Sequence, residues 1–540
     1  MKTKFGILVL IICLTQVFAE YYSEEQGDHP RRTKRTVQLE EKTNNLREEL
    51  LEQPHWYKVG QEILKKHLST HLNTNIAKNV ILFLGDGLSI PTVTAARIYQ
   101  GQLNGREGEE DELSFEGFPF TGFSKPYCVD SQVADSACSA TAYLGGVKAN
   151  EGTIGVSARV EKSDCEAMRN VSNHVPSIAV WAQLAGKSTG FVTTTRVTHA
   201  SPAGIYAHTA DRDWEDDAGV GHSGYNATYC PDVAQQLINY KPGMDLNVIM
   251  GGGRRNFYPS EKTDAQGIKG KRKDGKNLIE DWEKNKIKRQ ASYAYVTTRD
   301  QLFGLNEVPD YLLGLFAPNH MDYHLEATKN SPTLEEMTEA AIKVLQKNSN
   351  GFFLFVEGGK IDLAHHENMA RKSLDETVEF AKAIKKATKL TSEEDTLIVV
   401  TADHSHVMTI NGYPKKGTNI LEFGGVDSDG LPYTTLSYAN GPGHKENENG
   451  KRANTKKFDL REKSFRYPAF IPLPLETHGG DDVGVYARGP WSHLFTVGLK
   501  QLDAIFVLGL LAALVMVSQP ATRRKPLKVT PSEEKLLVFV

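Results

Sequence analysis

The feature that most restricts the fold of this chain is a repeated unit, in which an apolar run ends in acidic or polar residues and a helical segment follows. The apolar run 80–84 is followed by Gly85 and Asp86, the run 352–356 is followed by Glu357, and the run 396–400 leads to Asp403. Runs that are apolar on both faces are typical of central strands in a parallel sheet. The alternation predicts an α/β fold with a central, mostly parallel sheet flanked by helices.

Other segments fit the same architecture. We expect further strands at 190–193, 248–250 and 485–487, and helices from near Trp56, over 334–345 and over 366–387. Ser89 and Pro91 are typical of a helix start. Residues 411–476 are rich in Gly, Pro, Asn and Lys and lack a long helical period, which predicts an inserted, loop-rich subdomain.

The N-terminus carries an export signal. Lys2 and Lys4 precede an apolar run, and small residues before position 20 predict a signal peptide over residues 1–19. Residues 20–52 are polar and include a basic run ending at Arg35, which is either a solvated segment or the end of a propeptide. The formal net charge of −4 argues against a nucleic-acid-binding protein.

Four cysteines remain after the signal peptide, and an exported protein can form disulfides between them. They allow three complete pairings, and spacing alone does not choose among them. Two sequons, at Asn170 and Asn226, predict glycosylation and a surface position for that region. The four cysteines are Cys128, Cys138, Cys165 and Cys230.

A serine in a run of small residues is the candidate nucleophile. Ser136 follows Asp135 and precedes Ala137, Cys138 and Ser139, so no bulky neighbour blocks the approach of a substrate or a metal ion. Without other evidence, such a run is more often the start of a helix. A serine hydroxyl needs a base or a metal ion to become a nucleophile, and no histidine flanks Ser136.

Metal ligands are available where the predicted strands end. Zinc binds histidine and carboxylate groups, whereas magnesium prefers oxygen ligands, so the set could hold two zinc ions and one magnesium ion. Two metal ions close together suit in-line phosphoryl transfer, and Arg212 could bind two phosphoryl oxygens. The candidate ligands are Asp86, Glu357, Asp362, His366, Asp403, His404 and His478.

Six of these motifs, in one order over about residues 53–494, closely resemble animal alkaline phosphatases. They are Gly85-Asp86-Gly87, Asp135-Ser136-Ala137, His199-Ala200-Ser201-Pro202, Glu357-Gly358-Gly359-Lys360-Ile361-Asp362, Ala402-Asp403-His404-Ser405-His406 and Glu476-Thr477-His478. The resemblance implies a secreted or cell-surface, commonly homodimeric enzyme that hydrolyses phosphate monoesters. It also implies that residues 411–476 form the surface region called the crown.

The resemblance also implies a role for individual residues. Ser136 is expected to become a phosphoserine, Arg212 to bind phosphate, and His199 and His406 to support the ligands. Cys165 and Cys230 are expected to form a disulfide. The implied ligands are Asp362, His366 and His478 for one zinc; Asp86, Asp403 and His404, with Ser136, for the second; and Asp86, Ser201 and Glu357 for magnesium.

Three departures from the family pattern matter. Ala317 and Ser331 stand where family members carry acidic calcium ligands, so we do not expect a calcium site. Cys128 and Cys138 match no family pair; we expect Cys138 to be a small buried residue, the alternative being a thiol whose oxidation blocks the site. Over residues 495–540 the resemblance ends, and the 14 apolar residues 504–517 predict a buried helix, a short membrane segment or an unusual lipid-anchor signal.

The sequence therefore predicts a metal-dependent phosphomonoesterase. A phosphodiesterase or a sulfatase of the same superfamily is the enzymatic alternative, but these typically use threonine or a modified cysteine where this chain has Ser136. A catalytically inactive surface receptor is the alternative from another class, and the complete ligand set argues against it.

Overall fold

The computed structural model describes residues 53–446, 452–496 and 498–500. The predicted signal peptide, the segment around Arg35 and the apolar run 504–517 lie outside these residues. The chain divides into two compact units, the first ending at Thr70 and the second beginning at His71. In the first unit, α3 (Gln53–Leu68) is a helix with no buried residue. Among the described helices, none has the length and apolar character that crossing a membrane requires.

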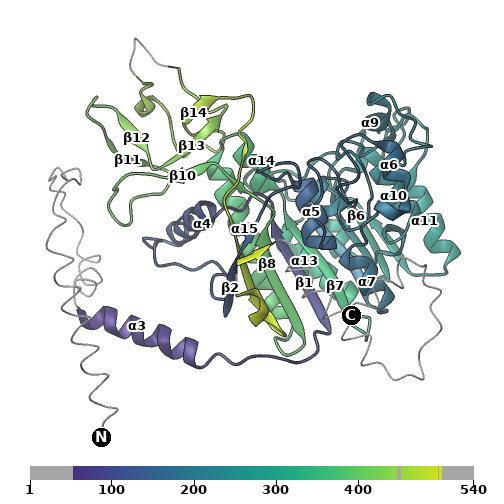
Figure 1. Cartoon of the computed structure of the whole chain (residues 1–540), viewed down its shortest axis with the longest axis horizontal. Helices are drawn as coiled ribbons and strands as arrows, with labels where there is room; N and C mark the ends of the chain where they lie inside the picture. Colours follow the sequence, from purple (N-terminus) through teal and green to yellow (C-terminus); the bar gives the residue numbers. More distant parts are fainter. Residues whose placement is uncertain (1–52, 447–451, 497, 501–540) are drawn as a thin grey trace, which may run out of the picture. The chain divides into compact units, whose positions relative to one another are not determined.

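A ten-stranded sheet forms the centre of the second unit (Figure 1). Seven adjacent strands, from β8 to β5, run parallel, and β16 pairs antiparallel with both β8 and β2. The mostly parallel sheet predicted from the apolar runs is thereby confirmed. In spatial order the strands are β17 (Gly498–Lys500), β2 (Phe120–Lys125), β16 (Val483–Arg488), β8 (Thr396–Ala402), β1 (Asn79–Gly85), β7 (Phe352–Gly358), β3 (Ser188–Arg196), β4 (Val248–Gly252), β6 (Tyr311–Leu315) and β5 (Tyr293–Val296).

Helices cover both faces of this sheet, and alternate strand residues enter two different cores. In β1, Ile81 and Phe83 belong to the core beneath α4 (Ile90–Leu103), α13 (Leu334–Leu345) and α15 (Ala370–Leu390). Leu82 and Leu84 belong to the opposite core. The helices of that second core are α5 (Ser136–Gly145), α7 (Ile178–Leu184), α10 (Val233–Asn239) and α11 (Leu278–Lys288).

Local sequence signals explain where several helices begin. Ser89 accepts a hydrogen bond from Thr92 N and α4 then begins, as the sequence predicts. Thr333 and Glu336 form a capping box at the start of α13. The shorter helices are α6 (Cys165–Arg169), α8 (Ala200–Ala203), α9 (Asp217–His222), α12 (Arg299–Phe303) and α14 (Lys360–His366).

The predicted helix over 366–387 is wrong at its start. The structure has two helices there, because α14 ends at His366 and α15 begins at Ala370. Between them Asn368 has a φ of 55°, and its side chain donates to Asn440 O and accepts from Gly443 N. An asparagine tolerates this left-handed conformation, and its two hydrogen bonds tie the break to the inserted subdomain.

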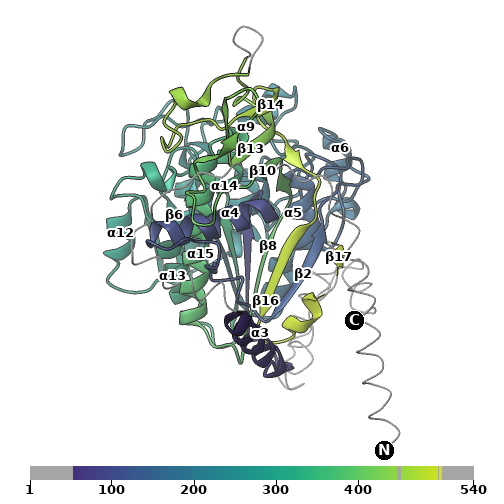
Figure 2. The ribbon, with the colours of Figure 1, turned by 90° about the vertical axis from the view of Figure 1, so that its left-hand side faces the viewer.

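The inserted subdomain carries small sheets of its own, at the top of both views (Figures 1 and 2). Three strands, β10 (Met408–Ile410), β13 (Leu436–Gly441) and β14 (Ala469–Pro472), form one sheet, and β11 (Phe423–Val426) pairs with β12 (Pro432–Thr434). The chain then returns through β15 (His478–Gly479), which pairs antiparallel with β9 (Ser405–His406) and places His478 opposite His406.

Candidate active site

The candidate site lies where three neighbouring parallel strands end. Asp86 follows β1, Glu357 lies near the end of β7, and Asp403 follows β8. The register pairs Leu84 with Glu357, and Gly85 with Ala402. The three carboxylates therefore meet at one edge of the sheet, where open α/β sheets bind ligands.

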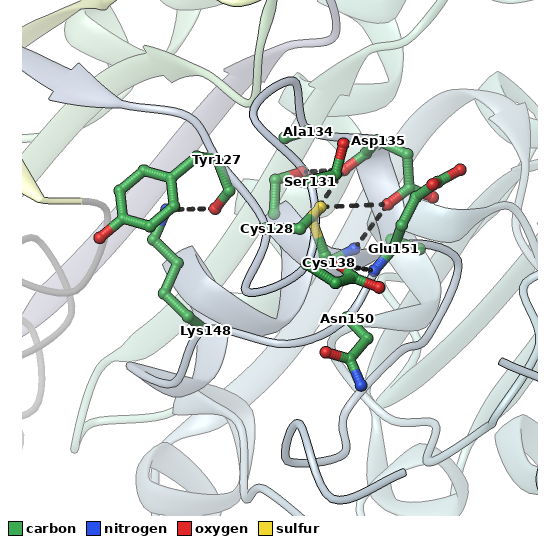
Figure 3. Close-up of a disulfide and its surroundings, with 12 residues drawn as sticks. Tyr127, Cys128, Ser131, Ala134, Asp135, Cys138, Lys148, Asn150 and Glu151 are labelled. Carbon is green, nitrogen blue, oxygen red and sulfur yellow. Dashed lines mark hydrogen bonds between the residues drawn. A yellow bond between two sulfur atoms is a disulfide. The ribbon is translucent and has the colours of Figure 1, made fainter. Parts of the chain in front are cut away.

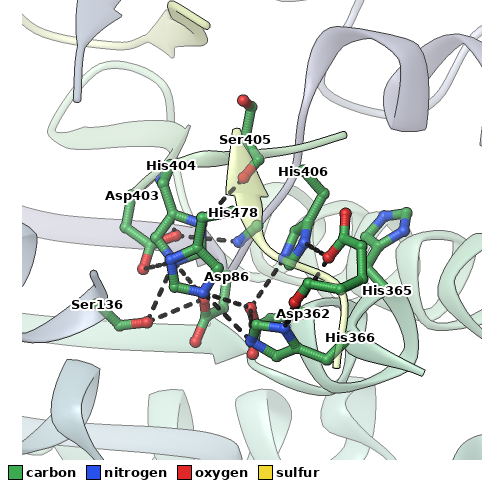
Figure 4. Close-up of polar contacts among 12 residues, drawn as sticks. Asp86, Ser136, Asp362, His365, His366, Asp403, His404, Ser405, His406 and His478 are labelled. Carbon is green, nitrogen blue, oxygen red and sulfur yellow. Dashed lines mark hydrogen bonds and ion pairs between the residues drawn. The ribbon is translucent and has the colours of Figure 1, made fainter. Parts of the chain in front are cut away.

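The candidate nucleophile is the first residue of α5. Asp135, rather than Ser136, caps this helix by accepting a hydrogen bond from Cys138 N at 3.1 Å. Ser136 is almost fully buried, and its Oγ lies 3.4 Å from Asp86 Oδ1 and 3.2 Å from His404 Nε2 (Figure 4). Its neighbours are a carboxylate and an imidazole that follow β1 and β8, not a flanking histidine.

A second group of ligands lies beside the first. Asp362 and His366 share one face of α14, with 3.2 Å between Asp362 Oδ1 and His366 Nε2. His478 reaches the same place from β15, with its Nε2 3.4 Å from Asp362 Oδ1 and 3.2 Å from His366 Nε2. The rings of His404 and His478 stack with centroids 3.5 Å apart, so the two groups are contiguous (Figure 4).

The oxygens of the site fit divalent cations. Asp86 Oδ2, Ser201 Oγ and Glu357 Oε1 are buried and have no hydrogen-bond partner among the described residues. Buried polar atoms are normally satisfied, because leaving one unpaired is costly. Asp86, Asp403 and His404 each place a ligand atom within 4.8 Å of the others, and so do Asp86, His199 and Glu357. A cation at each place would be bound by carboxylate oxygens that are buried together.

The pKa shifts of the carboxylates also indicate a cation-binding site. Burial, reinforced by Asp403, Asp362 and Glu357, raises the pKa of Asp86 well above its usual range, and burial raises the pKa of Glu357 to about 7. Burial also opposes ionisation of Asp362, but His366 and the neighbouring imidazoles hold its pKa well below the usual range. Burial thus disfavours ionisation of the Asp86 and Glu357 carboxylates, and a bound cation would favour it.

Arg212 is one of the residues that line the cavity of the site. Its Nη1 donates to Asp135 Oδ2 at 2.9 Å, and its Nη2 lies 3.3 Å from His199 Nε2. It lines a cavity of about 660 Å³ together with Ser136, His199, Asp362, His366 and His478. The same cavity is lined by Arg196 and His320, which the sequence analysis did not single out.

Two acidic residues support the site, although the sequence analysis assigned no role to either of them. Glu476 Oε2 accepts from His406 Nδ1 at 2.6 Å, and the other ring nitrogen of His406 lies 2.8 Å from Asp362 Oδ1. Asp135 forms the ion pair with Arg212. The available signal was sequence proximity, because Asp135 precedes Ser136 and Glu476 lies two residues before His478.

The four cysteines that the structure describes form two disulfides. Cys165 pairs with Cys230, the pair that the family resemblance implies. Cys128 pairs with Cys138, so the expectation that Cys138 is an unpaired small residue is wrong, and so is the alternative of a free thiol beside Ser136 (Figure 3). The loop after Cys128 leads into α5, whose third residue, Cys138, comes to lie beside Cys128. No local sequence pattern predicts this pairing. Both sequon asparagines, Asn170 and Asn226, are exposed.

A parallel sheet covered on both faces, with this set of ligands where its strands end, defines the class of metal-dependent α/β enzymes. The alkaline phosphatase family model matches residues 77–513. A membrane-bound alkaline phosphatase of Bombyx mori is 49% identical over 449 residues, covering 82% of each chain. The tissue-nonspecific isozyme of Rattus norvegicus is 48% identical over 451 residues, covering 82% of this chain and 84% of the rat protein. The chain belongs to the alkaline phosphatase family, whose members are phosphomonoester hydrolases.

Solved structures agree on the fold. The crystal structure of Thermus thermophilus alkaline phosphatase aligns with 84% of this chain and 99% of its own, with a TM-score of 0.57 and 21% sequence identity. At that identity the likeness concerns the fold alone.

Proposed function

We propose that this protein hydrolyses phosphate monoesters through a phosphoserine on Ser136, using two zinc ions and one magnesium ion. The observation that carries the proposal is the meeting of Ser136 and Arg212 with the histidine and carboxylate cluster in one cavity. A phosphoryl group entering this cavity meets a hydroxyl nucleophile and a guanidinium.

The ligands divide according to their chemistry. The nitrogen-containing groups suit zinc, and the set made only of oxygens suits magnesium. We assign Asp362, His366 and His478 to the first zinc, Asp86, Asp403 and His404 with Ser136 to the second, and Asp86, Ser201 and Glu357 to magnesium. The distances within each zinc set and the unpaired oxygens of the magnesium set support this division.

Two displacements at phosphorus account for hydrolysis. Ser136 Oγ attacks phosphorus, the ester oxygen leaves with its electron pair and takes up a proton, and water then cleaves the phosphoserine to give inorganic phosphate. When bound, the metal ions would supply the positive charge that favours the ionised serine and stabilises the departing oxygen. Arg212 binds two phosphoryl oxygens and holds phosphorus in line with Ser136.

The residues that support the ligands act by orientation. His406 lies between Glu476 and Asp362, which fixes its ring and keeps one Asp362 oxygen occupied. Burial opposes protonation of His406, but Glu476 and Asp362 raise its pKa to about 10. His199 accepts from Arg212 and stays neutral, because burial, followed by Arg212 and Arg196, lowers its pKa well below the usual range.

A comparison of two substrates tests the activity. Purified full-length protein supplied with zinc and magnesium should turn over p-nitrophenyl phosphate much faster than bis(p-nitrophenyl) phosphate. Faster cleavage of the diester would favour the phosphodiesterase, and no turnover of either compound would favour the inactive receptor. Ser136→Ala is the matched control for contaminating activity.

We also propose a cell-surface location. The predicted signal peptide over residues 1–19, the two disulfides and the exposed Asn170 and Asn226 support passage through the secretory pathway. On this proposal residues 53–494 form the catalytic domain, which works as a homodimer, and residues 495–540 attach it to the membrane. Mass spectrometry of the mature C-terminus and the mass of the intact assembly in solution test attachment and dimerisation.

A further inference from the structure

We propose that the Cys128–Cys138 disulfide is a positioning element for the phosphate-binding side of the active site, an inference that rests on the roles proposed above for Ser136 and Arg212. The disulfide joins residues 10 apart and closes residues 128–138 into a covalent ring (Figure 3). This ring contains Ala134, Asp135 and Ser136, three consecutive residues that each contact or form part of the site.

Each of these three residues fixes a different part of the site. Ala134 O accepts a hydrogen bond from His478 Nδ1 at 2.8 Å, which leaves Nε2 of that ring directed at Asp362 and His366. Asp135 binds the guanidinium of Arg212. Ser136 is the proposed nucleophile. A displacement of the ring would therefore move a ligand, the phosphate clamp and the nucleophile together.

Asp135 connects the ring to Arg212 at two points. Its Oδ2 accepts from Arg212 Nη1 at 2.9 Å. Its Oδ1 accepts from Cys138 N at 3.1 Å and from Gly152 N at 3.2 Å, and Gly152 O accepts from Arg212 N at 2.8 Å. Both the side chain and the backbone of Arg212 thus depend on where Asp135 lies.

The other anchors of this ring are mostly hydrogen bonds: Val129 N donates to Ala149 O at 2.9 Å, and Asp130 Oδ1 accepts from Glu151 N at 2.9 Å. Apolar packing ties the ring to the main core only through Ala137, because the two cysteines and Ala134 form a small separate group with Ala149. The larger apolar side chains point outward, since Val129 is 55% exposed and Val133 is 37% exposed. Alanine side chains bury little area, so we expect the covalent bond to add a restraint that apolar packing gives this ring only weakly.

Loss of this disulfide should therefore weaken phosphate binding before it unfolds the protein. Without the cross-link, the segment bearing Asp135 samples more conformations, and fewer of them hold Arg212 where it binds phosphate. The expected signature is at least a tenfold rise in the inhibition constant for inorganic phosphate, with KM rising in parallel. A fall in kcat should accompany it, because Ser136 and His478 lose the same support.

The test compares two double variants of the full-length protein loaded with zinc and magnesium. Cys128→Ala with Cys138→Ala removes the proposed element. Cys165→Ala with Cys230→Ala is the matched control, because that disulfide is also buried but packs with Trp214 and Val220 in another cluster. Phosphate inhibition of p-nitrophenyl phosphate hydrolysis, melting temperature and zinc content are measured for each.

We expect the first variant to lose at least tenfold in phosphate affinity, and the control to lose thermal stability with phosphate affinity within about twofold of wild type. A folded first variant with wild-type phosphate inhibition would overturn the inference. Equal losses of phosphate affinity in both variants would overturn it too, because the effect would then be general loosening.

If the first variant does not fold, reduction of the wild-type protein with a phosphine replaces it. Peptide mapping identifies which disulfide has opened, and reoxidation should restore phosphate affinity. Unchanged phosphate inhibition with Cys128–Cys138 open would refute the positioning role. A wild-type protein that neither cleaves p-nitrophenyl phosphate nor binds phosphate would instead refute the proposed function, so the two failures are distinguishable.

Discussion

Replacement of Arg212 by alanine should weaken phosphate binding far more than it weakens the fold. The Arg212 guanidinium donates one hydrogen bond to Asp135 and one to His199. It lines the same cavity as Ser136. Among the described residues no other hydrogen bond of this guanidinium is found, so its remaining N–H groups can bind phosphoryl oxygens, and a planar guanidinium can bind two at once.

The size of the effect follows from the number of hydrogen bonds lost. Each hydrogen bond to a charged group contributes about 1.5–3 kcal/mol, and a free-energy change of about 1.4 kcal/mol is a tenfold change in affinity. Losing two such bonds, partly replaced by water, should raise the inhibition constant for inorganic phosphate at least tenfold. Because the bonds exist in the bound substrate as well as in the transition state, KM should rise more than kcat falls.

The assay measures phosphate inhibition and melting temperature on the same preparation of Arg212→Ala, with Arg212→Lys as the control. Lysine keeps the charge beside Asp135 but cannot bind two oxygens in a fixed plane, so its phosphate affinity should fall between alanine and wild type. A lowered melting temperature with unchanged phosphate inhibition would show that Arg212 acts only as the structural partner of Asp135, and the clamp would be refuted.

Three further outcomes are expected. Lys286 is fully buried, donates to Met244 O at 2.8 Å, and has its pKa lowered to about 7 by burial and then by Arg289. The unfolded chain then binds one more proton between about pH 7 and pH 10, so the free energy of unfolding should rise with pH there. Denaturant titrations of Lys286→Met should show a smaller rise than wild type, and an identical slope would contradict this. Removing metal ions with a chelator should lower the melting temperature, because Asp86, Glu357 and Asp403 are buried together at one edge, and adding zinc and magnesium should restore it. Calcium added to the zinc- and magnesium-loaded protein should leave the melting temperature unchanged, because Ala317 and Ser331 offer no carboxylate; a clear increase would show a calcium site built from other residues.

The sheet could be predicted from the sequence because its strands are buried on both faces. Burial on both faces makes a strand apolar at every position, as in residues 80–84, and such a run is visible without any partner. The acidic residues after these strands could be assigned to one site, because parallel strands end at the same edge. The predicted helix over 334–345 matches α13, whose capping residues are local signals.

Other features depend on contacts between distant residues. Asn368 breaks the predicted helix over 366–387 because its side chain binds the inserted subdomain, which begins more than forty residues later. The ion pair of Asp135 with Arg212 spans 77 residues. The pairing of Cys128 with Cys138 follows from the path of the loop between them. None of these contacts has a local pattern from which a single sequence could predict it.

The most direct test of the whole account is the identity of the phosphorylated residue. Wild-type protein incubated with a phosphate monoester and quenched in acid should yield one phosphorylated peptide, with the phosphoryl group on Ser136. Ser136→Ala should yield no phosphopeptide while its zinc and magnesium contents stay close to those of wild type. A covalent phosphoenzyme formed by Ser136→Ala, or phosphate found on another residue of the wild-type protein, would contradict the account.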